Sequence, residues 1–131
     1  MHMNYIQLTQ SQKYKIIHFQ ETVYLALLQS NCISEYIEIG DFYGNPEVAI
    51  IDHDEKWCAI GGCGLIIYFI KEPFILYQYG QQTFQYFELH RNPPSIWWID
   101  ALQQISPSKI LITLENAETR TIDILTKEIN L

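Results

Sequence analysis

Apolar and polar residues alternate through most of the chain, which predicts short β-strands joined by turns. The clearest case is Lys56–Ile70, in which two apolar runs flank the cluster Gly61–Gly64. Both runs are rich in β-branched and aromatic residues, the types that fill a pleated, half-buried surface. We therefore expect a central hairpin, Trp57–Ile70, at the core of the fold.

The second run of this hairpin is apolar on both of its alternating faces. The residues of one face are Leu65, Ile67 and Phe69, and those of the other are Ile66, Tyr68 and Ile70. A strand with one face in water keeps polar residues on that face. The pattern therefore predicts a strand that is covered on both sides.

Shorter alternating segments predict further strands on either side of this hairpin. Before it they are Tyr5–Leu8, Lys13–Phe19, Ser34–Ile39 and Glu47–Ile51, the last joined to the hairpin by the polar connection Asp52–Glu55. After it, Phe74–Tyr79 and Thr83–Leu89 are expected to pair around Gly80–Gln82. Lys109–Leu114 and Thr119–Leu125 are expected to form a terminal hairpin, with Ile122 and Ile124 inward. Glycine and proline predict loops at Gly40–Pro46 and His90–Ser95.

Two segments fit a helix as well as a strand. One is Thr22–Ser30, and the other is Ile96–Ile105, where apolar residues recur at three-residue steps that suit a helix capped by Ser95. We favour strands for both. The predicted fold is mainly β, or α+β with at most one or two short helices, as an antiparallel meander, barrel-like or sandwich sheet built around Trp57–Ile70. The segment Val48–Phe69 also looks like the middle of a propeller blade, but a closed propeller needs about four or more blades.

The size and composition indicate one domain. A chain of 131 residues and 15.4 kDa, 48% hydrophobic, has enough apolar residues to fold alone, so residues 1–131 are expected to form a single domain, with Met1–His2 as a cloning remnant. There is no apolar run of roughly 18 residues and no signal-peptide pattern. The three cysteines are an odd number, which does not suggest a disulfide framework. A cytoplasmic location with reduced thiols follows as the expectation.

The negative charge is concentrated in one third of the chain. The net charge is −7, and residues 16–55 hold eight of the 15 acids and none of the eight Lys and Arg residues. Such a field repels nucleic acid and anionic membranes and speeds encounter with a basic partner. The alternative interpretation is that these acids are the solvated faces of hairpins.

Several residues are candidates for chemistry. The residue types of a metal site occur together at Asp52, His53, Asp54, Glu55, Cys58 and Cys63. Zinc signatures place two cysteines two to four residues apart with a second pair elsewhere, and no second pair exists here. Buried structural thiols are therefore favoured over a metal site, and no cofactor is expected.

A thiol nucleophile would need Cys58 or Cys63 with His53 or His90 as the base. Acidic surroundings raise the pKa of a thiol and oppose its activation. The glycines of Gly61–Gly64 lead into a strand rather than a helix, so they predict a tight turn and not a phosphate loop. The carboxylate pairs Asp52 with Asp54 and Glu35 with Glu38 have the character of surface charge.

An aromatic group was also noted, composed of Tyr77, Tyr79, Tyr86, Trp97 and Trp98. Tyrosine and tryptophan anchor many protein interfaces, and they are equally common in β cores. A surface on which bases stack would also be basic, and this chain has the opposite charge.

The chain is small, acidic and β-rich, and it contains the strand-turn-strand segments Glu47–Phe69 and Trp98–Ile124. In these features it resembles the immunity proteins of bacterial polymorphic-toxin and contact-dependent growth inhibition systems. The resemblance implies a non-enzymatic antitoxin that binds one basic toxin domain and covers its active or substrate-binding surface. The acids expected to contact this partner are Glu35, Glu38, Asp41, Asp52, Asp54 and Glu55. The alternatives are a small cytosolic enzyme with a Cys/His pair, or a self-associating structural subunit.

Overall fold

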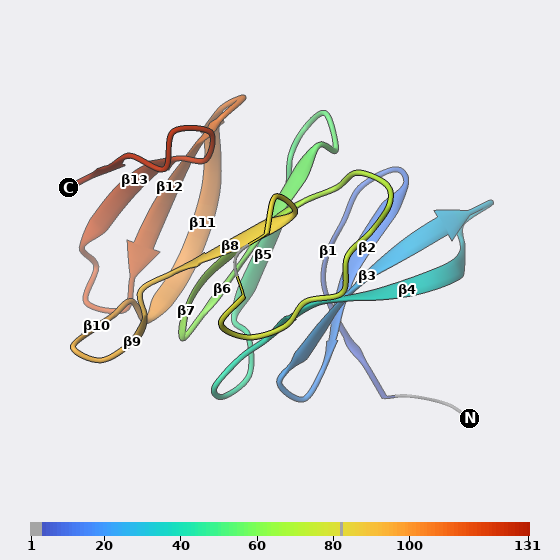
Figure 1. Ribbon diagram of the computed structural model, residues 1–131, viewed down its shortest axis with the longest axis horizontal. Helices are drawn as coiled ribbons and strands as arrows, with labels where there is room; N and C mark the ends of the chain where they lie inside the picture. Colours follow the sequence, from blue (N-terminus) through green and yellow to red (C-terminus); the bar gives the residue numbers. More distant parts are fainter. Residues whose placement is uncertain (1–3, 82) are drawn as a thin grey trace.

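A computed structural model describes residues 4–81 and 83–131. The described chain forms three consecutive four-stranded antiparallel meanders and one two-stranded hairpin (Figure 1). The N-terminal sheet contains β1 (Ile6–Gln10), β2 (Tyr14–Phe19), β3 (Thr22–Gln29) and β4 (Cys32–Asp41). The central sheet contains β5 (Val48–Ile51), β6 (Trp57–Gly62), β7 (Gly64–Phe69) and β8 (Tyr86–Leu89).

The small hairpin consists of β9 (Arg91–Asn92) and β10 (Ser95–Ile96). The C-terminal sheet contains β11 (Ile99–Ser106), β12 (Lys109–Leu114), β13 (Thr119–Asp123) and β14 (Ile129–Asn130). Residues 4–81 and 83–131 include no helix, and so none long and apolar enough to span a membrane.

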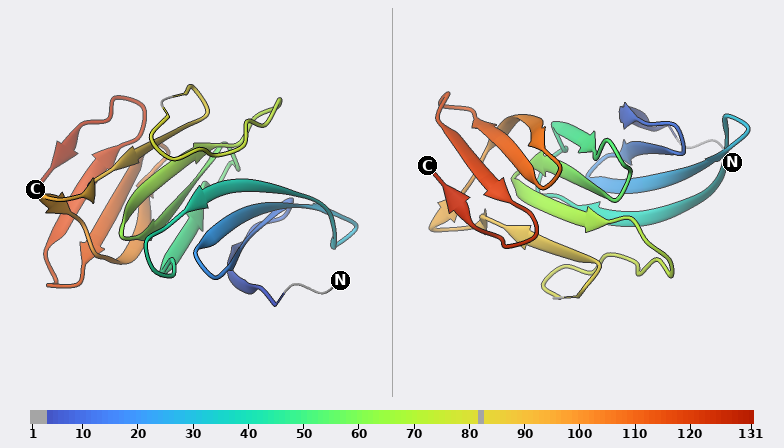
Figure 2. Two further views of the ribbon diagram at one scale, coloured as in Figure 1. Left: turned by 60° about the horizontal axis from the view of Figure 1, so that its bottom comes forward. Right: turned by 90° about the horizontal axis from the view of Figure 1, so that it is seen from above.

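The three large sheets stack face to face in chain order, and the two termini lie at opposite ends of the stack (Figure 2). Strand β5 contacts both β1 and β11, so the first strands of the three sheets are neighbours. The sheets therefore fan out like three blades of a propeller. None of them closes on itself within the described residues, and the stack stays open at both ends.

Two hydrophobic cores separate the three sheets. The first lies between the N-terminal and central sheets and includes Ile16, Leu25, Ile39, Cys58, Ile66 and Tyr68. The second lies between the central and C-terminal sheets and includes Ala59, Leu65, Ile67, Ile99, Ile110 and Ile122. Alternate residues of β7 therefore enter different cores, which confirms that the central strand is covered on both sides.

Most sequence predictions of strands are confirmed. Thr22–Gln29 is a strand rather than a helix, and Trp57–Gly62 pairs with Gly64–Phe69 as the predicted central hairpin. The terminal hairpin forms with Ile122 and Ile124 buried. The segment Ile96–Ile105, which fitted a helix or a strand, is also β structure. Ile96 belongs to β10 (Ser95–Ile96), and residues 99–105 belong to β11 (Ile99–Ser106).

Two predictions about the connection after β7 were wrong. Residues 74–79 form no strand, and β8 pairs with β7 instead of with them. The backbone N–H groups of this segment bond elsewhere: Ile75 N donates to Gln85 Oε1 (2.8 Å), Tyr77 N to Glu38 O (3.0 Å) and Gln78 N to Tyr86 Oη (3.0 Å). The predicted loop 90–95 is in part the β9–β10 hairpin. The predicted turn includes Gln82, which is outside the described residues.

Candidate functional site

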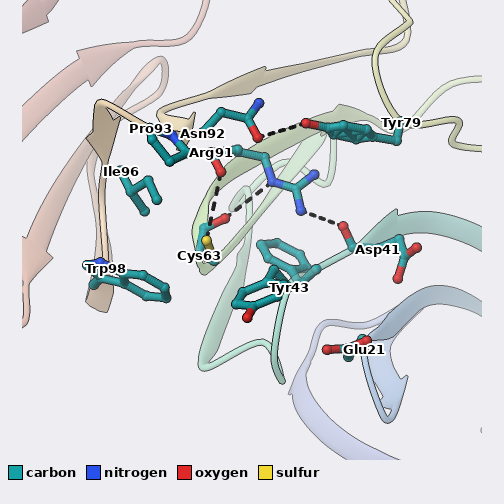
Figure 3. A pocket seen from close by; sticks show the side chains of 11 residues that line it. Glu21, Asp41, Tyr43, Cys63, Tyr79, Arg91, Asn92, Pro93, Ile96 and Trp98 are labelled. Atoms are coloured by element: carbon teal, nitrogen blue, oxygen red, sulfur yellow. Dashed lines mark hydrogen bonds between the residues drawn. The ribbon is translucent and has the colours of Figure 1, made fainter.

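A cavity of about 570 Å³ opens at the end of the stack where the connections between sheets cross (Figure 3). We call it the aromatic cleft. Its walls come from the β2–β3 turn, the end of β4, the β6–β7 turn and the β9–β10 hairpin. The lining residues are Glu21, Asp41, Phe42, Tyr43, Cys63, Tyr79, Arg91, Asn92, Pro93, Ile96 and Trp98.

The glycine cluster forms the tight turn at the floor of this cleft, as the sequence predicted. Gly62 pairs with Gly64 across the turn, and Cys63 forms an isolated bridge with Trp98. Gly64 has a φ of +89°, and a Cβ there would lie 2.8 Å from the Cα of Arg91. A glycine is therefore required for β9 to approach the turn this closely.

Arg91 joins four segments around the cleft. Its Nε donates to Cys63 O (3.2 Å), one Nη donates to Asp41 O (2.5 Å), and the other donates to the hydroxyl of Tyr77 (2.7 Å). That second Nη also pairs with the Glu88 carboxylate. Because the Arg91 charge is neutralised by Glu88 and four of its five N–H donors are occupied, Arg91 acts as a structural cation.

Tyr77 completes this buried network. Its hydroxyl donates to Glu88 Oε1 (2.6 Å) while it accepts from Arg91. Burial, followed by the hydrogen bond to Glu88, raises the pKa of Tyr77 far above its ordinary value. The phenol therefore stays protonated and serves as a permanent donor to the carboxylate.

Two carboxylates lie on one side of the cleft, opposite Trp98 and Ile96 (Figure 3). Glu21 accepts a hydrogen bond from Gly44 N at Oε2 (2.6 Å), which fixes the loop after β4. Asp41 uses its backbone carbonyl for Arg91 and leaves its carboxylate directed away from that contact. Since Arg91 is neutralised by Glu88, the lining carries two uncompensated negative charges.

Three large aromatic side chains of the cleft are exposed to solvent. Tyr43 is 78% exposed, Tyr79 57% and Trp98 45%. Tyr79 is held in place by a hydrogen bond from its hydroxyl to Asn92 Oδ1 (2.8 Å). Rigid aromatic faces grouped around one cavity are a frequent feature of binding sites.

The aromatic group noted in the sequence divides between core and cleft. Tyr77, Tyr86 and Trp97 are buried, whereas Tyr79 and Trp98 line the cleft. No sequence pattern singled out Glu21, Tyr43 or Arg91. A signal was present only for Tyr43, which belongs to a predicted glycine-rich loop, where binding residues often lie.

The six predicted contact acids do not form one surface. Glu35 and Glu38 lie on opposite faces of β4, because Glu35 pairs with Leu27 and Glu38 with Tyr24 in an unbroken register. Asp41 ends the same strand at the cleft. Burial, and then the charge of Asp41, raises the pKa of Glu38.

The other three predicted acids are in the β5–β6 turn, at the opposite end of β5 from the cleft. Asp52 is 5% exposed and accepts from Lys56 N (3.1 Å) and Gln104 Nε2 (2.8 Å). Glu55 accepts from Ser11 Oγ (2.5 Å) and Lys13 N (2.9 Å). These two carboxylates hold the turn against neighbouring sheets, and Asp54 is the exposed acid among them.

Cys58, Cys63 and His90 are held in structural contacts, whereas Cys32 and His53 are exposed. Cys58 is fully buried, and this burial raises its pKa far above the ordinary value, which opposes formation of a thiolate. Cys63 is buried, and its Sγ lies 3.8 Å from Arg91 O. His90 bonds Ser95 Oγ through Nδ1 (2.9 Å) and stacks on Trp97. Within residues 4–81 and 83–131, no three His, Cys, Asp or Glu side chains converge as a metal site.

A second hollow, of about 770 Å³, lies beside β8 and is lined by Ile75, Phe84, Phe87 and Leu89 among others. Its charged residues, Glu88 and Lys127, have opposite signs, and Glu88 is already paired with Arg91. Lys127 is therefore the one uncompensated charge in the lining of this hollow, and its Nζ already lies over the ring of Phe87 (4.7 Å).

The aromatic cleft has the chemistry of a binding site for a cation. The faces of aromatic rings attract positive charge, and the two carboxylates on the opposite wall add to this attraction. No protein-family model, curated protein or solved structure matches this chain.

Proposed function

We propose that this chain is a non-enzymatic binding protein for a basic protein domain, in the manner of an immunity protein that neutralises a toxin. The observation that carries the proposal is the joint position of acids and exposed aromatics at the aromatic cleft. Asp41 and Glu21 line the side of the cleft opposite Trp98, and the segment that supplies both acids, residues 16–55, contains no Lys or Arg.

Binding would proceed in two steps. The negative field of the N-terminal sheet and the cleft attracts the basic domain and raises the association rate, most strongly at low salt. Short-range contacts of the aromatic side chains then hold the domain over the cleft, so that the acids occupy the place of substrate phosphates on the toxin. The toxin surface is thereby covered without chemical change.

The burial of the Cys58 thiol supports a binding function over catalysis by that cysteine. Cys58 lies inside the first core, where burial raises its pKa and keeps the thiol protonated. All three cysteines are free, which fits a reducing compartment, and the proposal places the chain in the cytoplasm.

The test is co-expression of the chain with each basic protein encoded by the reading frames that flank its gene. We expect one of them to arrest growth when expressed alone, to be neutralised by this chain, and to form a one-to-one complex that weakens as salt rises. A flanking set in which no protein binds the purified chain at low salt would contradict the proposal.

Charge reversal then locates the attraction. Glu35→Lys with Glu38→Lys on β4 should lower the association rate constant about tenfold at low salt, and the difference should shrink at high salt. The matched control is Asp100→Lys with Glu128→Lys, which makes the same charge change on exposed acids of the C-terminal part. An equal loss in association rate constant for both pairs of substitutions would mean that the rate depends on net charge alone and not on the position of the acids.

A further inference from the structure

We infer that the aromatic cleft receives one arginine side chain of the partner, an inference that rests on the proposed function and specifies its recognition step. The cleft combines exposed aromatic faces with two carboxylates, and its volume of about 570 Å³ lies within the usual range for sites that enclose a ligand. This volume accommodates a long side chain together with the backbone that carries it.

The aromatic wall selects a flat cation. Trp98 and Tyr43 present the exposed rings, whereas the ring of Tyr79 is already covered on one face by the guanidinium of Arg91 (5.7 Å) and is fixed by a hydrogen bond to Asn92. A guanidinium group is planar and weakly hydrated, so it stacks on such rings better than an ammonium group does. Arginine is therefore favoured over lysine.

The opposite wall supplies the counter-charge. The Asp41 carboxylate and the Glu21 carboxylate lie on the same side of the cleft (Figure 3). The forked donors of a guanidinium match carboxylate oxygens, and such charge-assisted bonds are stronger than neutral ones. Glu21 keeps Oε1 for a ligand while its Oε2 holds Gly44.

Arg91, which also lines the cleft, does not reverse the preference for a cationic ligand. Arg91 donates to the carbonyls of Cys63 and Asp41 and pairs with Glu88, and its guanidinium also lies over the ring of Phe42 (4.7 Å). An anion in the cleft would meet a neutralised Arg91 and two carboxylates. Electrostatics therefore favour a cationic ligand over an anionic one.

The first experiment uses N-acetyl-arginine amide as the probe and follows the indole N–H signals in ¹H–¹⁵N spectra. The Trp98 signal should shift and saturate, while those of the buried Trp57 and Trp97 should change less. N-acetyl-citrulline amide has nearly the same shape without the charge and should bind at least about tenfold more weakly. N-acetyl-lysine amide should fall between the two, and inorganic phosphate should not shift Trp98.

Equal binding of the citrulline and arginine probes, or a Trp98 shift with phosphate, would overturn the inference. So would an arginine titration that leaves the Trp98 signal unchanged.

Variants separate this inference from the proposed function. Asp41→Asn with Glu21→Gln keeps both side-chain shapes and should weaken the arginine probe about tenfold. Asp54→Asn, an exposed acid in the β5–β6 turn, should leave its affinity unchanged. A thermal melt of each variant confirms that the fold is retained.

The same variants are then assayed against the basic domain. Tight binding of that domain by the Asp41→Asn, Glu21→Gln variant would refute the arginine inference and leave the proposed function standing. Binding of the arginine probe by a chain that binds no basic domain would refute the proposed function and leave the cleft as a guanidinium site.

Discussion

At the scale of residues, the contacts around the cleft depend on the largely buried guanidinium of Arg91. Arg91 ties the end of β4, the β6–β7 turn and the 71–85 connection together through Asp41, Cys63 and Tyr77. Each of these contacts reaches across at least 14 positions of the chain. Loss of the guanidinium would leave the Glu88 carboxylate with the Tyr77 hydroxyl but without a counter-charge, and it would remove a donor from the carbonyls of Asp41 and Cys63.

We predict that Arg91→Met lowers the free energy of unfolding by about 3–5 kcal/mol, because removing one member of a buried ion pair leaves an uncompensated charge. The Arg91 and Glu88 side chains are only 8% and 15% exposed. The matched control is Arg120→Met, whose partner Glu118 is 56% exposed and whose loss should cost at most about 1 kcal/mol. Urea unfolding of both variants measures the difference, and similar losses would contradict the assigned role of Arg91.

A second residue-scale prediction concerns Gly64. Both Gly64 and Gly80 have positive φ, but a Cβ at Gly64 would collide with the Arg91 backbone and a Cβ at Gly80 would meet nothing within 4 Å. Gly80→Ala should therefore cost about 1–2 kcal/mol from backbone strain alone, and Gly64→Ala about 2 kcal/mol more. Thermal or urea unfolding of the pair checks this, and equal costs would show that β9 does not press on the turn.

At the scale of elements, β7 is the strand on which the two cores depend. Ile66 enters the core shared with the N-terminal sheet, and Ile67 enters the core shared with the C-terminal sheet. The sequence predicted this because a strand with two apolar faces has no face for water. The strict alternation of β12 and β13 made the terminal hairpin equally predictable.

The 71–85 connection was not predictable for a physical reason. Its composition suits a strand, but its backbone donors bond to the side chains of Gln85 and Tyr86 and to the carbonyl of Glu38. No local pattern shows that distant groups will compete for these donors. The cleft was hidden in the same way, because Glu21, Asp41, Arg91 and Trp98 come from four separate segments.

We predict that Ile66→Ala and Ile67→Ala each lower the free energy of unfolding by about 2–5 kcal/mol, since each leaves a cavity in a different core. Ile105→Ala serves as the control, because Ile105 is about half exposed on β11 and its loss should cost about 1 kcal/mol or less. Measurement is by urea unfolding. A cost for Ile67→Ala as small as that of the control would mean that the C-terminal sheet does not cover the central one.

A pH prediction belongs to β4. The pKa of Glu38 is raised from 4.5 by burial and by Asp41, so the folded state holds this proton more tightly than the unfolded state does. The resulting penalty is absent below pH 4.5 and grows as pH rises through the folded pKa. Glu38→Gln should therefore raise the urea midpoint at pH 7 and leave it nearly unchanged at pH 3.

Glu35→Gln, an exposed acid on the opposite face of β4, should leave the midpoint unchanged at both values of pH. A Glu38→Gln variant that is stabilised equally at pH 3 and pH 7 would show that charge is not the cause.

At the scale of the whole molecule, the position of the aromatic cleft follows from how the sheets are connected. The β4–β5 connection and the β8–β11 connection both cross the same end of the stack (Figure 1). Residues of both connections line the aromatic cleft. The opposite end carries the β5–β6 turn, where Asp52 and Glu55 are committed to holding neighbouring sheets. The acidic and aromatic residues that line the cleft therefore lie together at one end of the stack.

The most direct test of this arrangement is hydrogen–deuterium exchange of the chain, alone and in the presence of the basic domain that we propose as its partner. We predict that binding slows exchange in residues 41–47 and 91–98, which border the cleft, and leaves residues 108–128 of the C-terminal sheet unchanged. Protection confined to the β5–β6 turn or to the C-terminal sheet, with both cleft segments exchanging as before, would contradict it.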